Sequence, residues 1–181
     1  ILLMQGIYTE SEIKTAKENN IQVVIHKISQ FELIGKNDSE LGLWIKINTG
    51  MNRLGLSQEE LKEVYEKGII GSDSVLMTHM ACADNPDDPM NEMQINKFEK
   101  AFDIVERKTK RSICNSACLM NFPHLSFDWV RSGIAAYGGE SKNLNLKTAM
   151  TFRAPIISIR KIRKGERVGY GGRKKASKDM R

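Results

Sequence analysis

Residues 111–138 read RSICNSACLMNFPHLSFDWVRSGIAAYG and contain two polar turns, each directly after a short apolar run. The first turn spans residues 115–117 and the second residues 131–134. A strand that ends in small residues and then opens a helix leaves backbone N–H groups free, and with a serine hydroxyl these groups bind a phosphate or a carboxylate. Arg131 adds a fixed positive charge beside such a pocket. The stretch predicts an anion-binding sheet edge, although two buried strands with ordinary turns would show the same spacing.

Short apolar runs alternate with helical patterns along the chain as far as Gly138. Helical periodicity and two capping boxes, Thr9 with Glu12 and Ser57 with Glu60, predict helices at residues 9–19, 26–34, 57–66 and 89–108. The apolar runs predict six strands, at residues 1–4, 21–25, 43–47, 75–80, 112–114 and 127–130. This alternation predicts an α/β fold with a parallel sheet, and polar residues after the strands favour a partial (β/α)8 TIM-type barrel with about six of its eight strands.

The alternation stops after Gly138, and a different pattern begins. Residues 149–162 alternate apolar and polar side chains with a period of two, which is typical of a strand, before a turn at Lys164 and Gly165. We therefore expect two domains: residues 1–139 as a partial α/β barrel and residues 140–181 as a linker and the beginning of a β domain. The chain starts in the middle of a predicted strand without an initiator methionine, so we also expect a piece of a longer protein.

Composition narrows the class of protein. Hydrophobic residues make up 40% of the chain and charged residues 28%, as in soluble globular proteins. No apolar run is long enough to cross a bilayer and no signal-peptide pattern opens the chain, so we expect no membrane partner and a cytoplasmic protein. Much of the +6 net charge lies in residues 160–181 without interleaved aromatic residues, which indicates a solvated end and no nucleic-acid partner. The three cysteines lack metal-ligand spacing and are expected to be reduced.

Polar side chains follow successive predicted strands, and together they indicate a site. Arg53 follows the third strand, His79 the fourth, and Arg131 the last. Taken singly, His79 reads as a structural histidine and Arg53 as a surface ion-pair partner. A zinc site with His79, Cys82 and Asp84 is not predicted, because these residues would not share a face and a fourth ligand is missing. The joint placement after strand ends favours an anionic aromatic cofactor and no metal.

Five motifs in order resemble the alanine racemase family, and they cover nearly the whole chain. KINTGMNRLG at residues 46–55 resembles the family signature, usually K-x-D-T-G-M-G-R-L-G, and THMACAD at 78–84 is similar to T-H-x-A-x-A-D. NSA at 115–117, FDWVRSGIAAYG at 127–138 and GERVGYGG at 165–172 are similar to the later motifs. The resemblance implies a pyridoxal-phosphate-dependent racemase of L- and D-alanine, built from a barrel and a C-terminal β domain. It also implies a homodimer with shared active sites that supplies D-alanine for cell-wall peptidoglycan.

The resemblance also implies roles for individual residues. Arg131 matches the arginine that bonds the cofactor's pyridine nitrogen, and His79 matches the histidine that holds this arginine in place. Asn115 and Ser116 belong to the cofactor-binding NSA motif, and Ser116, Gly133 and Ile134 match the phosphate cradle.

Three further residues have a counterpart in the family. Arg53 matches the arginine that bonds the cofactor's phenolic oxygen and takes part in substrate binding. Lys46 matches a lysine that is carbamylated in some members. Tyr170 matches the catalytic tyrosine, which acts on the Cα proton of the L-enantiomer in the partner subunit's site. Without the resemblance, Tyr170 reads as a hairpin tyrosine packed at a domain edge.

The chain departs from the family pattern at three points. Asn48 stands where Asp is usual, and Asn52 where Gly is usual. No stretch matches the motif of the lysine that binds the cofactor covalently, so we expect these 181 residues alone to be inactive. Alternatives are a racemase of broader amino-acid specificity and a non-catalytic pyridoxal-phosphate-binding barrel protein. The period-two pattern at 149–162 and Tyr170 argue against the second alternative.

Overall fold

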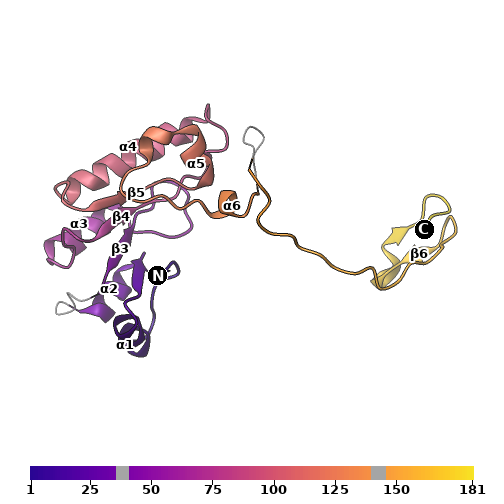
Figure 1. Cartoon of the computed structure of the whole chain (residues 1–181), viewed down its shortest axis with the longest axis horizontal. Helices are drawn as coiled ribbons and strands as arrows, with labels where there is room; N and C mark the ends of the chain where they lie inside the picture. Colours follow the sequence, from indigo (N-terminus) through magenta and orange to yellow (C-terminus); the bar gives the residue numbers. More distant parts are fainter. Residues whose placement is uncertain (36–40, 140–145) are drawn as a thin grey trace. The chain divides into compact units, whose positions relative to one another are not determined.

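The computed structural model describes residues 1–35, 41–139 and 146–181, which form two compact units, Ile1–Lys147 and Thr148–Arg181. The first unit contains a five-stranded sheet in the order β1-β2-β3-β4-β5, and every neighbouring pair of strands is parallel (Figure 1). The strands are β1 (Leu2–Leu3), β2 (Gln22–Ile25), β3 (Leu43–Lys46), β4 (Val75–Met77) and β5 (Lys110–Ser112). The sheet order follows the sequence order, as in an α/β barrel.

Helices connect the strands and continue beyond the last one. They are α1 (Glu10–Glu18), α2 (Ile28–Ile34), α3 (Gln58–Glu66), α4 (Pro89–Ile104), α5 (Ser116–Asn121), the 3-10 helix η1 (Pro123–Leu125) and the short helix α6 (Gly133–Ala136). A parallel strand pair needs a crossover connection, and one of the first four helices lies in each crossover between neighbouring strands. The first unit is therefore a partial α/β barrel, as the sequence predicts.

Both predicted capping boxes are present. Glu12 N–H donates to Thr9 Oγ1 (3.3 Å) while Thr9 N–H donates to Glu12 Oε2 (3.1 Å). The same reciprocal pair joins Ser57 and Glu60 at the start of α3 (3.1 and 2.7 Å). Each box satisfies two backbone N–H groups that a helix start leaves without partners, and it thereby fixes where α1 and α3 begin.

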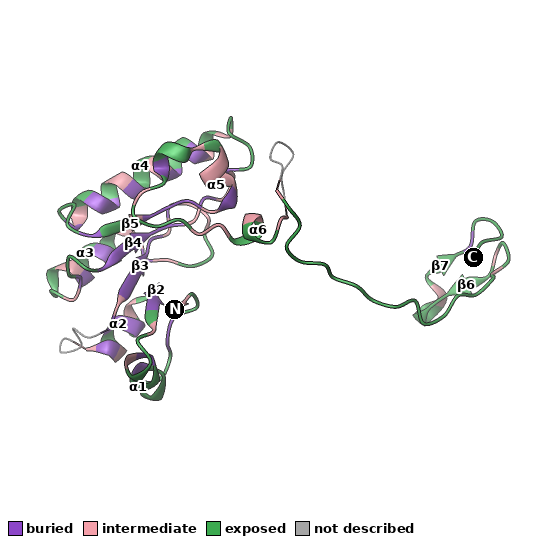
Figure 2. Cartoon of the chain, in the orientation of Figure 1, coloured by how far each residue is buried: buried purple, intermediate pink, exposed green. Residues whose placement is uncertain are grey.

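The two faces of the sheet have different roles. One face packs against the helices in the main core, where Ile25, Ile45 and Leu76 are fully buried (Figure 2). Strand register places Val24, Trp44 and Val75 in one row of the opposite face, and Lys46, Met77 and Ser112 in the next row. We call this opposite face the inner face. Because side chains alternate along a strand, Lys46 points away from the helices, toward the interior side of the partial barrel.

The sixth predicted strand, at residues 127–130, is wrong. The segment does run beside β5, since Trp129 N–H donates to Arg111 O (3.2 Å) and Arg131 N–H donates to Cys114 O (2.9 Å). Side chains replace the missing ladder bonds: Asp128 Oδ2 accepts from Arg111 N–H (2.8 Å) and Ser112 Oγ donates to Trp129 O (2.8 Å). A chain held in this way satisfies its polar groups without regular strand pairing.

Other predicted boundaries also change. The helix predicted to reach residue 108 ends at Ile104, before Glu106 and Arg107, whose φ angles are 51° and 53°. The strand predicted at residues 149–162 is wrong: it has no ladder within the described chain, and only Ile162 pairs, in an isolated bridge with Met180. A period-two pattern predicts a strand only when another strand pairs with it and something covers its apolar face.

The second unit is small and contains an antiparallel pair, β6 (Arg167–Val168) with β7 (Lys174–Lys175), joined through the 3-10 helix η2 (Tyr170–Gly172). The predicted domain boundary between residues 139 and 140 borders residues 140–145, which lie outside the described residues. Over the part of the chain that is described, no helix is long and apolar enough to span a membrane.

Candidate functional site

The C-terminal ends of β3, β4 and β5 bring most of the predicted site residues to one edge of the sheet. Parallel strands end at the same edge, so residues that are far apart in the sequence meet there. Lys46 is the last residue of β3, His79 follows β4 by two positions, and Asn115 and Arg131 follow β5. Because the strand register aligns Lys46, Met77 and Ser112, the last residues of β3, β4 and β5, the three strands end at the same level of this edge.

Arg131 is a half-buried cation of this edge. Its guanidinium donates to Ser112 Oγ, to Thr78 O and, at 3.4 Å, to Ile113 O. Its Nε is also buried, and among the described residues this N–H has no hydrogen-bond partner. Burial lowers the pKa of Arg131 to about 10, so the group stays protonated at neutral pH. Arg131 thus combines a retained charge with a buried Nε–H donor that is unused among the described residues.

His79 is held neutral. Its Nε2 lies 3.4 Å from Asn115 Nδ2. Burial is the main cause that lowers the pKa of His79 to about 4, and the charges of Arg131, Lys46 and Arg53 lower it further. The hydrogen bonds that hold Arg131 come from Ser112, Thr78 and Ile113 rather than from His79. The charge of Arg131 therefore acts on His79 by lowering its pKa, without a hydrogen bond between the two side chains among the described residues.

Lys46 and Arg53 are two further cations of the edge. Lys46 is only 5% exposed, and its pKa is lowered by burial and then by the charges of Arg53 and Arg131. The Arg53 side chain is exposed and has no hydrogen bond or ion pair with any described residue. Three cations thus face a region without a described carboxylate partner, which favours an anionic ligand.

The loop that carries Arg53 is built around the two departures from the family motif. Asn48 Oδ1 accepts from the N–H groups of Gly50 (3.1 Å) and Asn52 (3.0 Å), and Asn48 Nδ2 donates to Asn52 Oδ1 (2.9 Å). Asn52 has a φ of 55°, in the left-handed region that glycine adopts freely and asparagine tolerates better than most residues. This conformation explains why Gly is usual at that position and why Asn can replace it.

The two polar turns of residues 111–138 lie next to each other. Asn115 caps α5 by accepting from Cys118 N–H (2.9 Å), and Ser116 Oγ accepts from Ala135 N–H (3.1 Å). Gly133 begins α6, and a Cβ added there would meet nothing within 4 Å. Ile134 is 54% exposed. Gly133 and Ile134 therefore border open space at the place where the sequence predicts a phosphate cradle, whereas Ser116 is buried and its hydroxyl joins the two turns.

Tyr170 belongs to the second unit, at the start of η2, and its side chain is fully exposed. The three cysteines are free, as predicted, and Cys114 Sγ lies 3.1 Å from Cys118 Sγ. Among the described residues, no cluster of three or more histidine, cysteine, aspartate or glutamate side chains could hold a metal.

Sequence reasoning missed the residues that hold the site together. Ser112 was read only as part of a strand, yet its hydroxyl bonds Arg131 and Trp129. The apolar periodicity of residues 89–108 does not single out Gln94, since its apolar neighbour Met93 is 39% exposed. Gln94 is fully buried instead, four residues before Phe98 on the covered face. A polar residue in register with buried apolar ones is the signal that could have found it.

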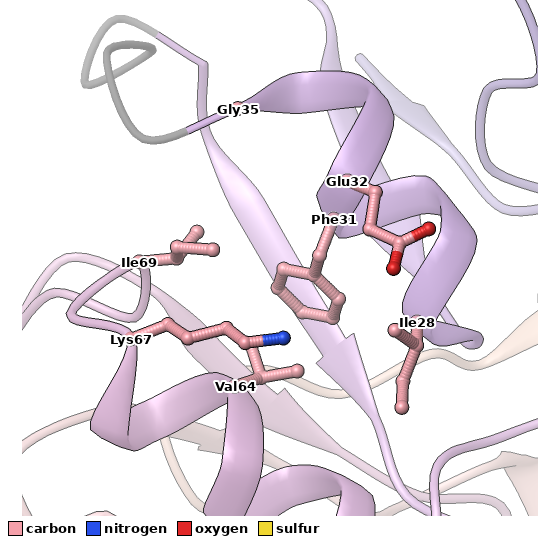
Figure 3. Close-up of a pocket in the computed structure, with 7 residues that line it drawn as sticks. All are labelled: Ile28, Phe31, Glu32, Gly35, Val64, Lys67 and Ile69. Atoms are coloured by element: carbon pink, nitrogen blue, oxygen red, sulfur yellow. The ribbon is translucent and has the colours of Figure 1, made fainter.

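A separate cavity of about 290 Å³ lies between α2 and α3 (Figure 3). Phe31 and Val64 line it with apolar surface, and Glu32 and Lys67 stand at its border. None of the predicted site residues lines this cavity. It offers neither the buried arginine nor the N–H-rich turns of the sheet edge, so it does not fit the predicted cofactor.

Comparison with known proteins identifies the family of the chain. Residues 1–141 match the family model described as "Alanine racemase, N-terminal domain". An alanine racemase of Vesicomyosocius okutanii subsp. Calyptogena okutanii (strain HA) is 41% identical over 178 residues, which are 94% of this chain and 50% of that protein. An alanine racemase of Coxiella burnetii (strain RSA 331 / Henzerling II) is 36% identical over 99% of this chain and 54% of its own length.

Solved structures give the same result. Alanine racemase from Acinetobacter baumannii has a TM-score of 0.73 at 37% identity, over 99% of this chain and 53% of that one. Biosynthetic alanine racemase from Pseudomonas aeruginosa has a TM-score of 0.77 at 33% identity, over 99% of this chain and 52% of that one. The chain spans about half the length of the curated relatives it matches.

Proposed function

The chain belongs to the alanine racemase family, and from that premise we propose that the whole protein interconverts L-alanine and D-alanine with pyridoxal phosphate as cofactor. The observation that supports this most strongly is the buried guanidinium of Arg131, whose Nε donor is unused among the described residues at an edge rich in cations. We take residues 1–139 as the cofactor-binding domain and residues 140–181 as the beginning of the second domain.

The residues of the edge fit this cofactor. The pyridine nitrogen is an acceptor, and Arg131 Nε is a buried donor without a described partner. The phosphate is an anion, and Gly133 and Ile134 border open space beside two turns that the hydrogen bond from Ala135 N–H to Ser116 Oγ holds together. When bound, pyridoxal phosphate withdraws electrons from the amino acid and makes its Cα proton easier to remove.

Arg131 sets the protonation of the site. A guanidinium donates a hydrogen bond without giving its proton away, and a pKa of about 10 keeps it charged at neutral pH. Arg131 beside the pyridine nitrogen would therefore leave that nitrogen unprotonated and would limit how strongly the ring attracts electrons, which would disfavour side reactions.

Lys46 is a candidate for carbamylation that would orient Arg53. Carbon dioxide adds to a neutral amine, and a lowered Lys46 pKa increases the neutral fraction. Addition of carbon dioxide forms an N–C bond and releases one proton, which leaves a carbamate anion. The same charges of Arg53 and Arg131 that disfavour the ammonium would attract this anion. Arg53 would then face the cofactor's phenolic oxygen and the substrate carboxylate.

Tyr170 is the candidate for proton transfer at Cα of L-alanine, in the site of a partner subunit of a homodimer. A tyrosine needs cationic neighbours to act near neutral pH, since its ordinary pKa is about 10. The opposite base would be the family's covalently bound lysine, whose motif matches no stretch of these 181 residues. D-alanine would serve peptidoglycan synthesis in the cytoplasm, and the free cysteines support a reducing compartment.

Chiral chromatography of alanine incubated with the whole protein and pyridoxal phosphate tests the proposal. We expect either pure enantiomer to move toward a racemic mixture, and we expect other amino acids offered in parallel to react more slowly. Equal rates for larger amino acids would favour the racemase of broader specificity. Cofactor binding without racemisation of any amino acid would favour the non-catalytic barrel protein and would reject the proposed activity.

A further inference from the structure

Gln94 has a fully buried amide side chain that forms hydrogen bonds with two loops of the sheet edge, the loop of Arg53 and the loop of His79. It lies on α4, on the face that packs against the sheet. Its Nε2 donates to Thr49 Oγ1 (2.9 Å) and to His79 O (3.0 Å), and its Oε1 accepts from Ala81 N–H (2.8 Å). Both N–H groups and the carbonyl of the amide are therefore engaged, and the contacts fix its orientation.

One branch of this network leads to the loop of Arg53. Thr78 Oγ1 donates its only hydrogen to Ile47 O (2.9 Å), so the 2.8 Å contact between Thr49 and Thr78 must be donated by Thr49 Oγ1. The bonds thus run in one direction, from Gln94 through Thr49 and Thr78 to Ile47. Thr49 lies at the start of the loop that carries Arg53, and Thr78 O accepts from Arg131.

The other branch fixes the backbone around His79. Gln94 bonds the carbonyl of His79 and the N–H of Ala81, on either side of Met80. The backbone of His79 is thereby held where burial and the charges of Arg131, Lys46 and Arg53 keep its ring neutral. Because these bonds are buried, their loss would leave polar groups without partners and the loop would move to satisfy them.

The neighbouring Asn91 shows that α4 also contains a buried amide with a different connection. Asn91 is 2% exposed, one turn before Gln94, and its Nδ2 donates to Cys82 O (3.3 Å) and Asn85 O (2.8 Å). These acceptors lie beyond His79 in the sequence, away from both Arg53 and Arg131. Asn91 therefore resembles Gln94 in burial and in its donor bonds, but its Oδ1 has no partner among the described residues, and its hydrogen bonds do not reach Thr49, His79 or Ala81.

We propose that Gln94 is a positioning residue of the racemase, which holds the loops of His79 and Arg53 in fixed places relative to Arg131. This inference rests on the proposed function, because Gln94 can affect racemisation only if the whole protein is a racemase. It extends the site to the middle of α4.

The test compares Gln94→Met and Asn91→Leu in the whole protein, since both changes replace a buried amide by an apolar side chain of similar volume. We expect both to lower the thermal unfolding midpoint. Only Gln94→Met should raise the pKa of His79 from about 4 toward its ordinary 6.5, as followed by NMR of the imidazole during a pH titration. Only Gln94→Met should also lower kcat, by up to about a hundredfold, because the edge loses its alignment.

Two results would overturn the proposal: equal effects of both variants on His79 titration and kcat, or no effect of Gln94→Met on either. If Gln94→Met does not fold, Thr49→Val removes only the branch toward Arg53, and it should raise KM while His79 titrates as before. Unchanged KM and kcat in Thr49→Val would also count against Gln94. A parent protein without racemase activity would reject the proposed function, whereas the His79 titration would still decide whether Gln94 positions the edge.

Discussion

Arg131 is a buried cation whose described partners are a hydroxyl and two backbone carbonyls, with no carboxylate among them. A carboxylate partner would neutralise the charge and reduce its effect on a ligand. Carbonyl and hydroxyl dipoles hold the guanidinium in place and leave its charge available to its surroundings. That charge is felt by Lys46 and His79, whose pKa values it lowers.

His79 gives a pH prediction at the scale of one residue. Its pKa is about 4 in the folded protein and takes the ordinary value of 6.5 in the unfolded chain. Between these pH values the unfolded chain therefore binds a proton that the folded chain does not. Stability from neutral His79 is therefore complete above pH 6.5 and is lost progressively as the pH falls toward 4.

Urea unfolding at a series of pH values measures this effect, with His79→Gln as the control. The parent should lose stability across this pH range more steeply than the variant, which lacks the imidazole of residue 79. His26 and His124 are present in both proteins and cancel in the comparison. Parallel curves for the two proteins would show that His79 is not held neutral by the fold.

At the scale of elements, the loop between β3 and α3 depends on Gly55. Its φ is 130°, and an added Cβ would lie 2.5 Å from Asn48 N and 2.6 Å from Ile47 C. Both contacts are with backbone, so the loop that carries Arg53 would have to shift. Gly68 also has a positive φ, 71°, but an added Cβ would meet nothing within 4 Å, which makes it a matched control.

We expect Gly68→Ala to cost about 1–2 kcal/mol from its left-handed backbone alone. Gly55→Ala should cost more, because the clash adds to the strain, and it should also weaken pyridoxal phosphate binding. Urea unfolding and a cofactor titration of the whole protein measure both effects. Equal stability losses with unchanged cofactor affinity would contradict this account of the loop.

Elements set by local interactions could be predicted from the sequence. The capping boxes at Thr9 and Ser57 involve residues three positions apart, and both are confirmed. The strand ends that bring Arg53 and His79 to one edge also follow from local patterns, because parallel topology fixes that edge. Arg131 reaches the same edge from residues 127–130, which run beside β5 without forming the predicted strand. The resemblance to a family, rather than the pattern, gave each of these residues its expected role.

Elements set by distant partners could not be predicted. The segment at 127–130 has a strand-like composition, but Asp128 and Ser112 side chains take the place of ladder bonds with β5. Gln94 looks like a surface residue until the loops it bonds are known, 15 and 45 positions away along the chain. Both errors concern polar groups whose partners come from another part of the fold.

At the scale of the whole molecule, Tyr170 supports a prediction about shared active sites. It belongs to the second unit and is fully exposed there, so it is free to serve a neighbouring subunit. If it does, Tyr170→Phe and a variant without the covalently bound lysine should complement each other in mixed dimers. One site of each mixed dimer then carries both changes and the other carries neither.

Random mixing makes about half of the dimers mixed, each with one intact site, so about a quarter of parent activity should return. The racemase assay after subunit exchange measures this return, and mass spectrometry under native conditions shows that mixed dimers have formed. Mixed dimers that remain inactive would mean that Tyr170 serves its own subunit or has no catalytic role.

We propose that the edge formed by β3, β4 and β5 binds pyridoxal phosphate through Arg131 and the two turns, and a crystal structure of the whole protein with bound pyridoxal phosphate would show this binding. We expect the pyridine nitrogen to accept from Arg131 Nε and the phosphate to contact Ser116, Gly133 and Ile134. Cofactor bound elsewhere, with Arg131 Nε still without a partner, would contradict it.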